Sequence, residues 1–128
     1  MCIRDSAHTE NASAWYSGLS ATVVVSDLAN LEVSAVLSPH LRVGRLTRGG
    51  VESALLDFDA MRANCERLSH SAADFLLAER IVRDFSMKLA AADALHLASV
   101  KNLGAALATF DGRLAEASRM QGVEVALG

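Results

Sequence analysis

The stretch AAADALHLASV, residues 90–100, places a single aspartate, Asp93, in an otherwise apolar segment. Apolar residues on nearly every side predict a buried helix, in which an ionised carboxylate is costly unless cations or hydrogen-bond donors compensate it. The nearest lysines, Lys88 and Lys101, are five and eight positions away. Compensation must therefore come from elsewhere in the fold or from a bound cation. Two interpretations of Asp93 remain, hydrogen bonding to a neighbouring backbone and a metal or catalytic role.

A second carboxylate, Asp111, follows the short apolar run AALATF, residues 105–110, and precedes the helical pattern RLAEASRMQG, residues 113–122. This order predicts a strand that runs directly into a helix. Ligands of open α/β sheets bind at the carboxyl ends of the strands, which makes Asp111 a candidate ligand. The alternative is that Asp111 caps the helix after it.

The third candidate, Glu32, lies in a predicted helix that follows a β-branched strand at residues 22–25. Asp27 is predicted to be the N-cap of this helix. Glu32 lies between apolar positions, so its carboxylate is expected to face inward; snorkelling to the rim is the alternative. The positions predicted to form the apolar side are Leu28, Leu31, Ala35 and Val36.

The rest of the chain continues the alternation of strands and helices. Pro39 predicts that the helix ends or bends near Ser38, and Gly49-Gly50 predicts a break before a helix over residues 51–65. Asp57 and Asp59 fall on the solvated side of that helix. A short edge strand over residues 66–70, a helix over 71–85 with Ser71 as its cap and Asp74 in its first turn, and a last strand over 123–127 are also expected.

This alternation predicts right-handed βαβ units and a parallel sheet covered by helices on both faces. A length of 128 residues with 52% hydrophobic residues fits one domain with a proper core. A short amphipathic helix is expected around Trp15 and Tyr16, whereas residues 1–6 (MCIRDS) lead into no recognisable element.

Composition limits the classes of function. Two widely spaced cysteines indicate neither a zinc site nor a disulfide framework, and no apolar run approaches membrane-spanning length. A cytoplasmic protein without a membrane partner is therefore expected. The net charge of −3 excludes broad electrostatic attraction to nucleic acid, so any RNA contact must be local. Arg42, Arg45 and Arg48 form the best basic cluster, read as a solvated face or as an RNA-binding or partner-binding patch.

The run AADALHLASVKNLGAALATFDGRL, residues 91–114, and the earlier SDLANLEV, residues 26–33, closely resemble the signature of the PIN-domain family, specifically the VapC-type toxins of bacterial toxin–antitoxin pairs. The resemblance covers about residues 23–125. It does not extend to the start, where that family has a hydrophobic strand ending in an aspartate that binds metal. Asp5-Ser6 only superficially mimics that ending.

The resemblance implies a three-layer α/β/α fold with a central parallel sheet, forming one PIN-like domain over residues 1–128. It implies metal-dependent endoribonuclease activity, with Glu32, Asp93 and Asp111 as catalytic carboxylates that bind Mg²⁺ or Mn²⁺. Thr109 would support the site. Physical chemistry agrees with this set, because like charges brought together require a cation and these hard cations take oxygen ligands.

The implied partners are an RNA substrate and a cognate antitoxin protein, with a homodimer as one candidate assembly. The alternative is an inactive PIN fold that serves as a protein-binding module because its first metal ligand is missing. A receiver-like signalling domain would also gather acids at a sheet edge, but it needs a lysine after a late strand. Neither residues 111–114 nor residues 123–128 supply one.

Overall fold

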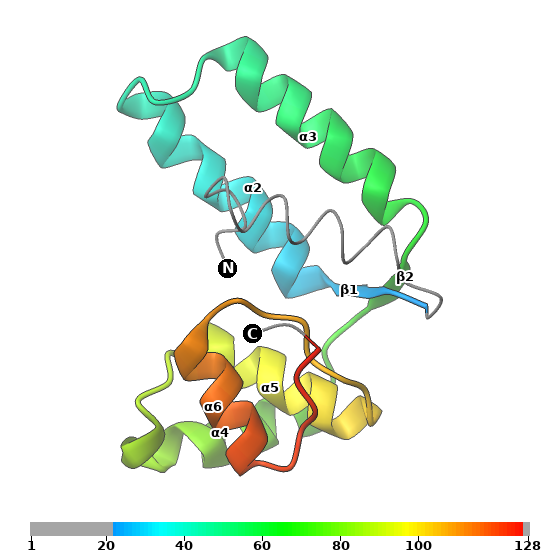
Figure 1. Ribbon diagram of the computed structural model, residues 1–128, viewed down its shortest axis with the longest axis vertical. Helices are drawn as coiled ribbons and strands as arrows, with labels where there is room; N and C mark the ends of the chain where they lie inside the picture. The colour runs from blue at the N-terminus through cyan, green and yellow to red at the C-terminus, as the bar shows by residue number, and fades with distance from the viewer. Residues whose placement is uncertain (1–21, 127–128) are drawn as a thin grey trace. The chain divides into compact units, whose positions relative to one another are not determined.

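The computed structural model describes residues 22–126, which divide into two compact units between Ser69 and His70 (Figure 1). Each unit is considered by itself. The predicted helix around Trp15 and Tyr16 and the segment MCIRDS lie outside the described residues. No helix of residues 22–126 combines the length and the apolar character needed to cross a membrane.

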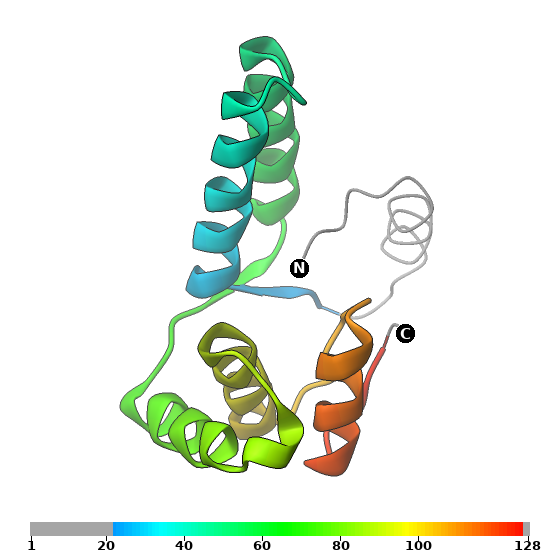
Figure 2. The same ribbon diagram turned by 90° about the vertical axis from the view of Figure 1, so that its left-hand side faces the viewer.

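The N-terminal unit consists of two short parallel strands joined through a pair of helices. Its elements are β1 (Val24–Ser26), α2 (Asp27–Arg42), α3 (Arg48–Arg62) and β2 (Glu66–Leu68). Val24 pairs with Glu66 and Ser26 with Leu68. Figures 1 and 2 both show α2 and α3 running side by side as an antiparallel pair. The predicted parallel pairing is thus observed, in a β–helices–β arrangement.

Local expectations at the start and end of α2 differ from the structure. Ser26, rather than Asp27, is the N-cap of α2, and its hydroxyl accepts a hydrogen bond from Ala29 N (3.0 Å). Helix α2 does not end near Ser38 but continues through Pro39 to Arg42, while the alternative expectation of a bend there stays a prediction. The proline removes only one backbone donor, and its own carbonyl still accepts from Val43 N (3.1 Å), so the final turn closes.

The predicted break at Gly49-Gly50 is instead the first turn of α3. Thr47 is the N-cap, and its hydroxyl accepts from Gly50 N (3.0 Å). A Cβ atom at Gly50 would lie 3.2 Å from that hydroxyl oxygen, so glycine suits the tight cap. A strong capping residue therefore prevails over the low helix propensity of two glycines.

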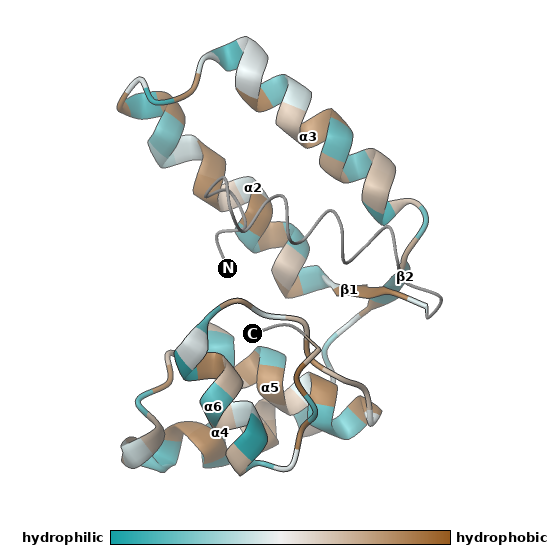
Figure 3. Cartoon of the chain, viewed as in Figure 1, coloured by the Kyte–Doolittle hydropathy of each residue, from teal (hydrophilic) through white to brown (hydrophobic). Residues whose placement is uncertain are grey.

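The apolar side predicted for α2 is also wrong. Leu31 is 66% exposed, Ala35 and Val36 are exposed, and the buried residue of the helix is Leu37. In α3, Ala54 is buried, while Asp57 and Asp59 are exposed as expected. Figure 3 shows hydrophobic and hydrophilic residues alternating along both helices. The hydropathy pattern alone was thus too weak to fix which side of α2 is covered.

The C-terminal unit contains most of the buried apolar residues. Its elements are α4 (Ala72–Arg83), the 3₁₀ helix η1 (Phe85–Met87), α5 (Ala91–Leu103) and α6 (Gly112–Met120). Helices α4 and α5 form the most extensive packing. The core is made by Ala78, Ile81, Ala94, Leu95, Leu97, Ala98, Leu107, Leu114, Ala115, Ala117 and Val123. The expectation that the segment around Asp93 is a buried helix is confirmed.

The two strands expected in this unit reduce to one parallel bridge between Leu107 and Val125. Leu107 N donates to Glu124 O, and Ala126 N donates to Leu107 O, both at 2.8 Å. Because only Leu107 pairs on both of its backbone groups, the apolar run 105–110 is an extended connection rather than a full strand. The mixed α/β class with parallel pairing is nevertheless confirmed.

Candidate functional site

Asp111 is the N-cap of α6, as one of its two interpretations predicted. Its Oδ1 atom accepts hydrogen bonds from Arg113 N (2.9 Å) and Leu114 N (3.1 Å). Its own backbone N–H donates to the hydroxyl of Thr109 (3.0 Å), a residue only 1% exposed. Asp111 itself is exposed. The carboxylate is therefore held at a fixed place on the surface by buried and helical partners.

Asp93 lies in the first turn of α5, three residues after the N-cap Ala90. Ala90 provides no side-chain capping bond, so the negative charge of Asp93 is the feature of this turn that complements the helix dipole. Asp93 is half-buried rather than buried, and it has an interaction partner. The helix behind it is tightly packed, since Ala94, Leu97 and Ala98 are fully buried.

Glu32 is half-buried on α2 in the N-terminal unit, whereas Asp93, Thr109 and Asp111 belong to the C-terminal unit. Convergence of the three carboxylates on one pocket stays a prediction. Within either unit taken by itself, the described residues contain no group of three or more His, Cys, Asp or Glu side chains that could hold a metal ion.

A buried polar network in the C-terminal unit was only partly foreseen. Ser71 and Asp74 form the expected capping box of α4, in which Asp74 Oδ2 accepts from Ser71 N (3.0 Å). Asp74 Oδ1 also accepts from the amide of Asn102 on α5 (2.8 Å). His70 Nδ1 lies 2.7 Å from the Ser99 hydroxyl and 4.0 Å from Asp74 Oδ2.

The electrostatics of this network favour a charged Asp74. Burial raises the pKa of the Asp74 carboxyl, but hydrogen bonds from Asn102, Ser71 and Ser99 and the charge of His70 outweigh it and hold the pKa below its ordinary value. Ser99 is 2% exposed, so substrate could not reach its hydroxyl. The network fastens α4 to α5, the helix that carries Asp93. Spacing within the sequence gave a signal only for the capping box, because the partners on α5 are distant along the chain.

Asp27, which was expected to be a cap, instead accepts hydrogen bonds from a residue of β2 and from a residue just after it. Its carboxylate accepts from the Arg67 guanidinium and, through Oδ2, from the Ser69 hydroxyl (2.9 Å). The side-chain hydrogen bond and charge of Asp27 raise the pKa of Arg67. The basic cluster of Arg42, Arg45 and Arg48 is exposed around the turn between α2 and α3. Neither group lies in the unit that contains Asp93 and Asp111.

Comparison with known proteins gives a family match and similarity to solved structures. A family model described as "PIN domain" matches residues 1–120. The structure is similar to a chain in the crystal structure of VapBC2 from Rickettsia felis bound to a DNA fragment from their promoter, with a TM-score of 0.65 and 14% sequence identity. The alignment covers 97% of this chain and 86% of that chain. No curated protein matches the sequence.

Proposed function

Because the chain belongs to the PIN domain family, we propose that it is a metal-dependent endoribonuclease of the VapC toxin type. PIN domains are in general nucleases, and the family match over residues 1–120 is the observation that carries the proposal. The proposed substrate is RNA. The proposed site consists of Glu32, Asp93 and Asp111, supported by Thr109.

The donor chemistry of these residues fits Mg²⁺ or Mn²⁺, since all three offer carboxylate oxygens to a hard cation. Asp111 is the best-defined of them: Oδ1 is occupied by the first turn of α6, and among residues 22–126 no hydrogen bond engages Oδ2. When bound, the cation would activate water and stabilise charge at the phosphodiester.

The chain's own residues would orient that chemistry. The buried hydroxyl of Thr109 fixes the backbone of Asp111, and the two N–H groups of α6 fix its carboxylate. The network of Asp74, Ser99 and Asn102 holds the helix that carries Asp93. Such fixed placement of reacting groups is a large source of catalytic rate, because the entropy of orientation is lost during folding rather than during reaction.

The proposed partner is an antitoxin protein that keeps the nuclease in check in the cytoplasm. The similarity to a chain of the Rickettsia felis VapBC2 structure supports this choice of partner. A homodimer is the proposed assembly of the toxin itself. Mixing the purified chain with the product of a neighbouring small gene, followed by size-exclusion chromatography with light scattering, tests both points.

The test of the enzymatic proposal is cleavage of labelled RNA in Mg²⁺, in Mn²⁺ and in chelator. Glu32→Gln, Asp93→Asn and Asp111→Asn should each lower the rate at least about a hundredfold, because members of one catalytic set fail together. Asparagine is as good an N-cap as aspartate, so Asp111→Asn should keep α6 intact.

The matched control is Asp57→Asn, which removes a carboxylate from the exposed side of α3 and should leave the rate unchanged. Circular dichroism verifies folding of each variant. Full activity of Asp93→Asn or Asp111→Asn would refute the proposed site. A wild-type chain that binds antitoxin yet cleaves no RNA with either metal would support the binding-module alternative.

A further inference from the structure

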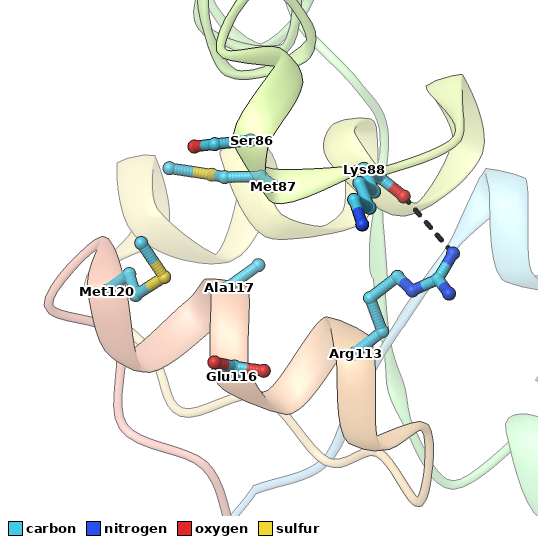
Figure 4. A pocket seen from close by; sticks show the side chains of 7 residues that line it. All are labelled: Ser86, Met87, Lys88, Arg113, Glu116, Ala117 and Met120. Carbon is cyan, nitrogen blue, oxygen red and sulfur yellow. Dashed lines mark hydrogen bonds between the residues drawn. The ribbon is translucent and has the colours of Figure 1, made fainter.

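A pocket of about 280 Å³ lies between η1 and α6 in the C-terminal unit (Figure 4). It is lined by Ser86, Met87 and Lys88 on one side and by Arg113, Glu116, Ala117 and Met120 of α6 on the other. Figure 4 shows the two methionines at one end and the two cations at the other. The pocket therefore has a methionine end, where Ser86 also lies, and a cationic end.

The cationic end includes a residue with an unusual backbone conformation. Lys88 has φ = 53°, the only positive φ at a non-glycine residue among residues 22–126. This left-handed conformation is disfavoured for a lysine and is found mostly where the surrounding structure imposes it. The Lys88 carbonyl accepts a long hydrogen bond from Arg113 Nη1 (3.5 Å), which keeps the guanidinium beside the lysine.

One lining residue of the pocket, Arg113, is bonded to the proposed metal-binding Asp111. Arg113 is two residues after Asp111, and its backbone N–H donates to Asp111 Oδ1. The side chains of residues two apart on a helix point in different directions, so Asp111 does not line the pocket, and the backbone bond joins the two residues at the start of α6. An RNA strand held by the Arg113 side chain would thus pass near a phosphate served by Asp111.

We propose that this pocket binds one nucleotide of the RNA strand, with its phosphate on Lys88 and Arg113 and its base against Met87 and Met120. The inference rests on the proposed function, of which it specifies a substrate subsite. Thioethers make favourable contacts with aromatic rings, and lysine and arginine neutralise phosphate. The volume lies just below the usual range for small-molecule pockets, which suits a single nucleotide.

The charge of the pocket agrees with the charge of the chain. Glu116 offsets one of the two cations, which leaves a formal charge of +1 in a protein of net charge −3. Binding of RNA would then depend on a local positive charge, as the net negative charge of the chain requires. An acidic peptide could also use the cations, but the bond of Arg113 to Asp111 and the methionine end favour a nucleotide.

The experiment measures binding of a short fluorescein-labelled single-stranded RNA by anisotropy, in chelator so that no metal or cleavage contributes. The double variant Lys88→Gln/Arg113→Gln should lower affinity about tenfold and flatten the slope of log K against log salt by about 1.4. Glu116→Gln should raise affinity, and Met120→Ala should lower it. The matched control, Arg80→Gln, removes an exposed cation from α4 of the same unit and should change affinity less than twofold.

Three results would overturn the inference: no RNA binding by the wild type, no loss in the double variant, or an equal loss in Arg80→Gln. Loss of binding to a labelled oligoglutamate with unchanged RNA binding would assign the pocket to an acidic protein instead. A different result would refute the proposed nuclease function without refuting the pocket. Absence of cleavage in Mg²⁺ and Mn²⁺, combined with RNA binding that depends on Lys88 and Arg113, would refute the nuclease and keep the pocket.

Discussion

The two units differ in how they are stabilised. In the N-terminal unit, the buried apolar residues of the long helices α2 and α3 are Leu37 and Ala54. In the C-terminal unit, helices α4, α5 and α6 surround a core centred on Leu97, which is fully buried. The comparison shows that the hydropathy pattern of a helix predicted its buried residues correctly in the unit where several helices share one core, and failed for α2, where they do not. Three predictions test this contrast, from the largest expected effect to the smallest.

The largest effect is expected for truncation in the C-terminal core. Leu97→Ala should lower the free energy of unfolding by about 2–5 kcal/mol, because it removes apolar contacts and leaves a cavity. Leu31→Ala on the exposed side of α2 should change it by less than about 0.5 kcal/mol. Urea unfolding followed by circular dichroism measures both. Equal effects would show that α2 is covered as heavily as α5.

A smaller effect is expected for the buried polar network. Asp74→Asn should cost about 1–3 kcal/mol at neutral pH, since it removes the buried charged acceptor of the part-buried hydrogen bonds from Ser71 and Asn102. The pKa of Asp74 is lowered in the folded state, so its charge stabilises the fold above the unfolded-state pKa of about 3.9.

This stabilisation is lost as the pH falls through the folded-state pKa. The difference in unfolding free energy between wild type and Asp74→Asn should therefore shrink below about pH 4. The titratable group that faces Asp74 is His70, whose Nδ1 lies 4.0 Å from Asp74 Oδ2. A difference that stays constant from pH 7 to pH 3 would show that the carboxylate charge does not matter.

The smallest effect is expected for the helix caps of the two units. Ser71→Ala removes a reciprocal capping box from α4 and should cost about 1 kcal/mol or more, whereas Thr47→Ala removes a single exposed bond from α3 and should cost about 0.5 kcal/mol. Native-state hydrogen exchange resolves the two helices separately. A larger loss of protection in α3 than in α4 would contradict the expectation that the cap of α4 contributes more to stability.

The sequence was most informative where a local signal and the tertiary structure agree. Ser71 with Asp74 identified the start of α4, and the apolar run around Asp93 identified the central helix of the C-terminal unit. The order of apolar run, Asp111 and helix located α6 correctly, and it also produced the capping interpretation. Each of these signals depends on residues within one turn of each other, which a sequence displays directly.

The failures arose where longer-range interactions decide. Pro39 is tolerated because the last turn of α2 closes through other backbone groups, and Gly49-Gly50 is helical because Thr47 caps it. For the candidate site, sequence motifs indicated Asp93, Thr109 and Asp111, but not the hydrogen bonds of Asp74 to Asn102 or of His70 to Ser99. Those contacts join residues 28 and 29 positions apart, and no local pattern encodes them.

The left-handed conformation of Lys88 also bears on protein engineering. A redesign for thermal stability would replace this residue with glycine first, because glycine relieves a strained positive φ without filling any space. The same substitution would delete one of the two cations of the pocket beside α6. Optimising the fold and preserving its ligand chemistry thus require opposite choices at one position, and a thermostabilised version of this protein is best made with Lys88 left unchanged.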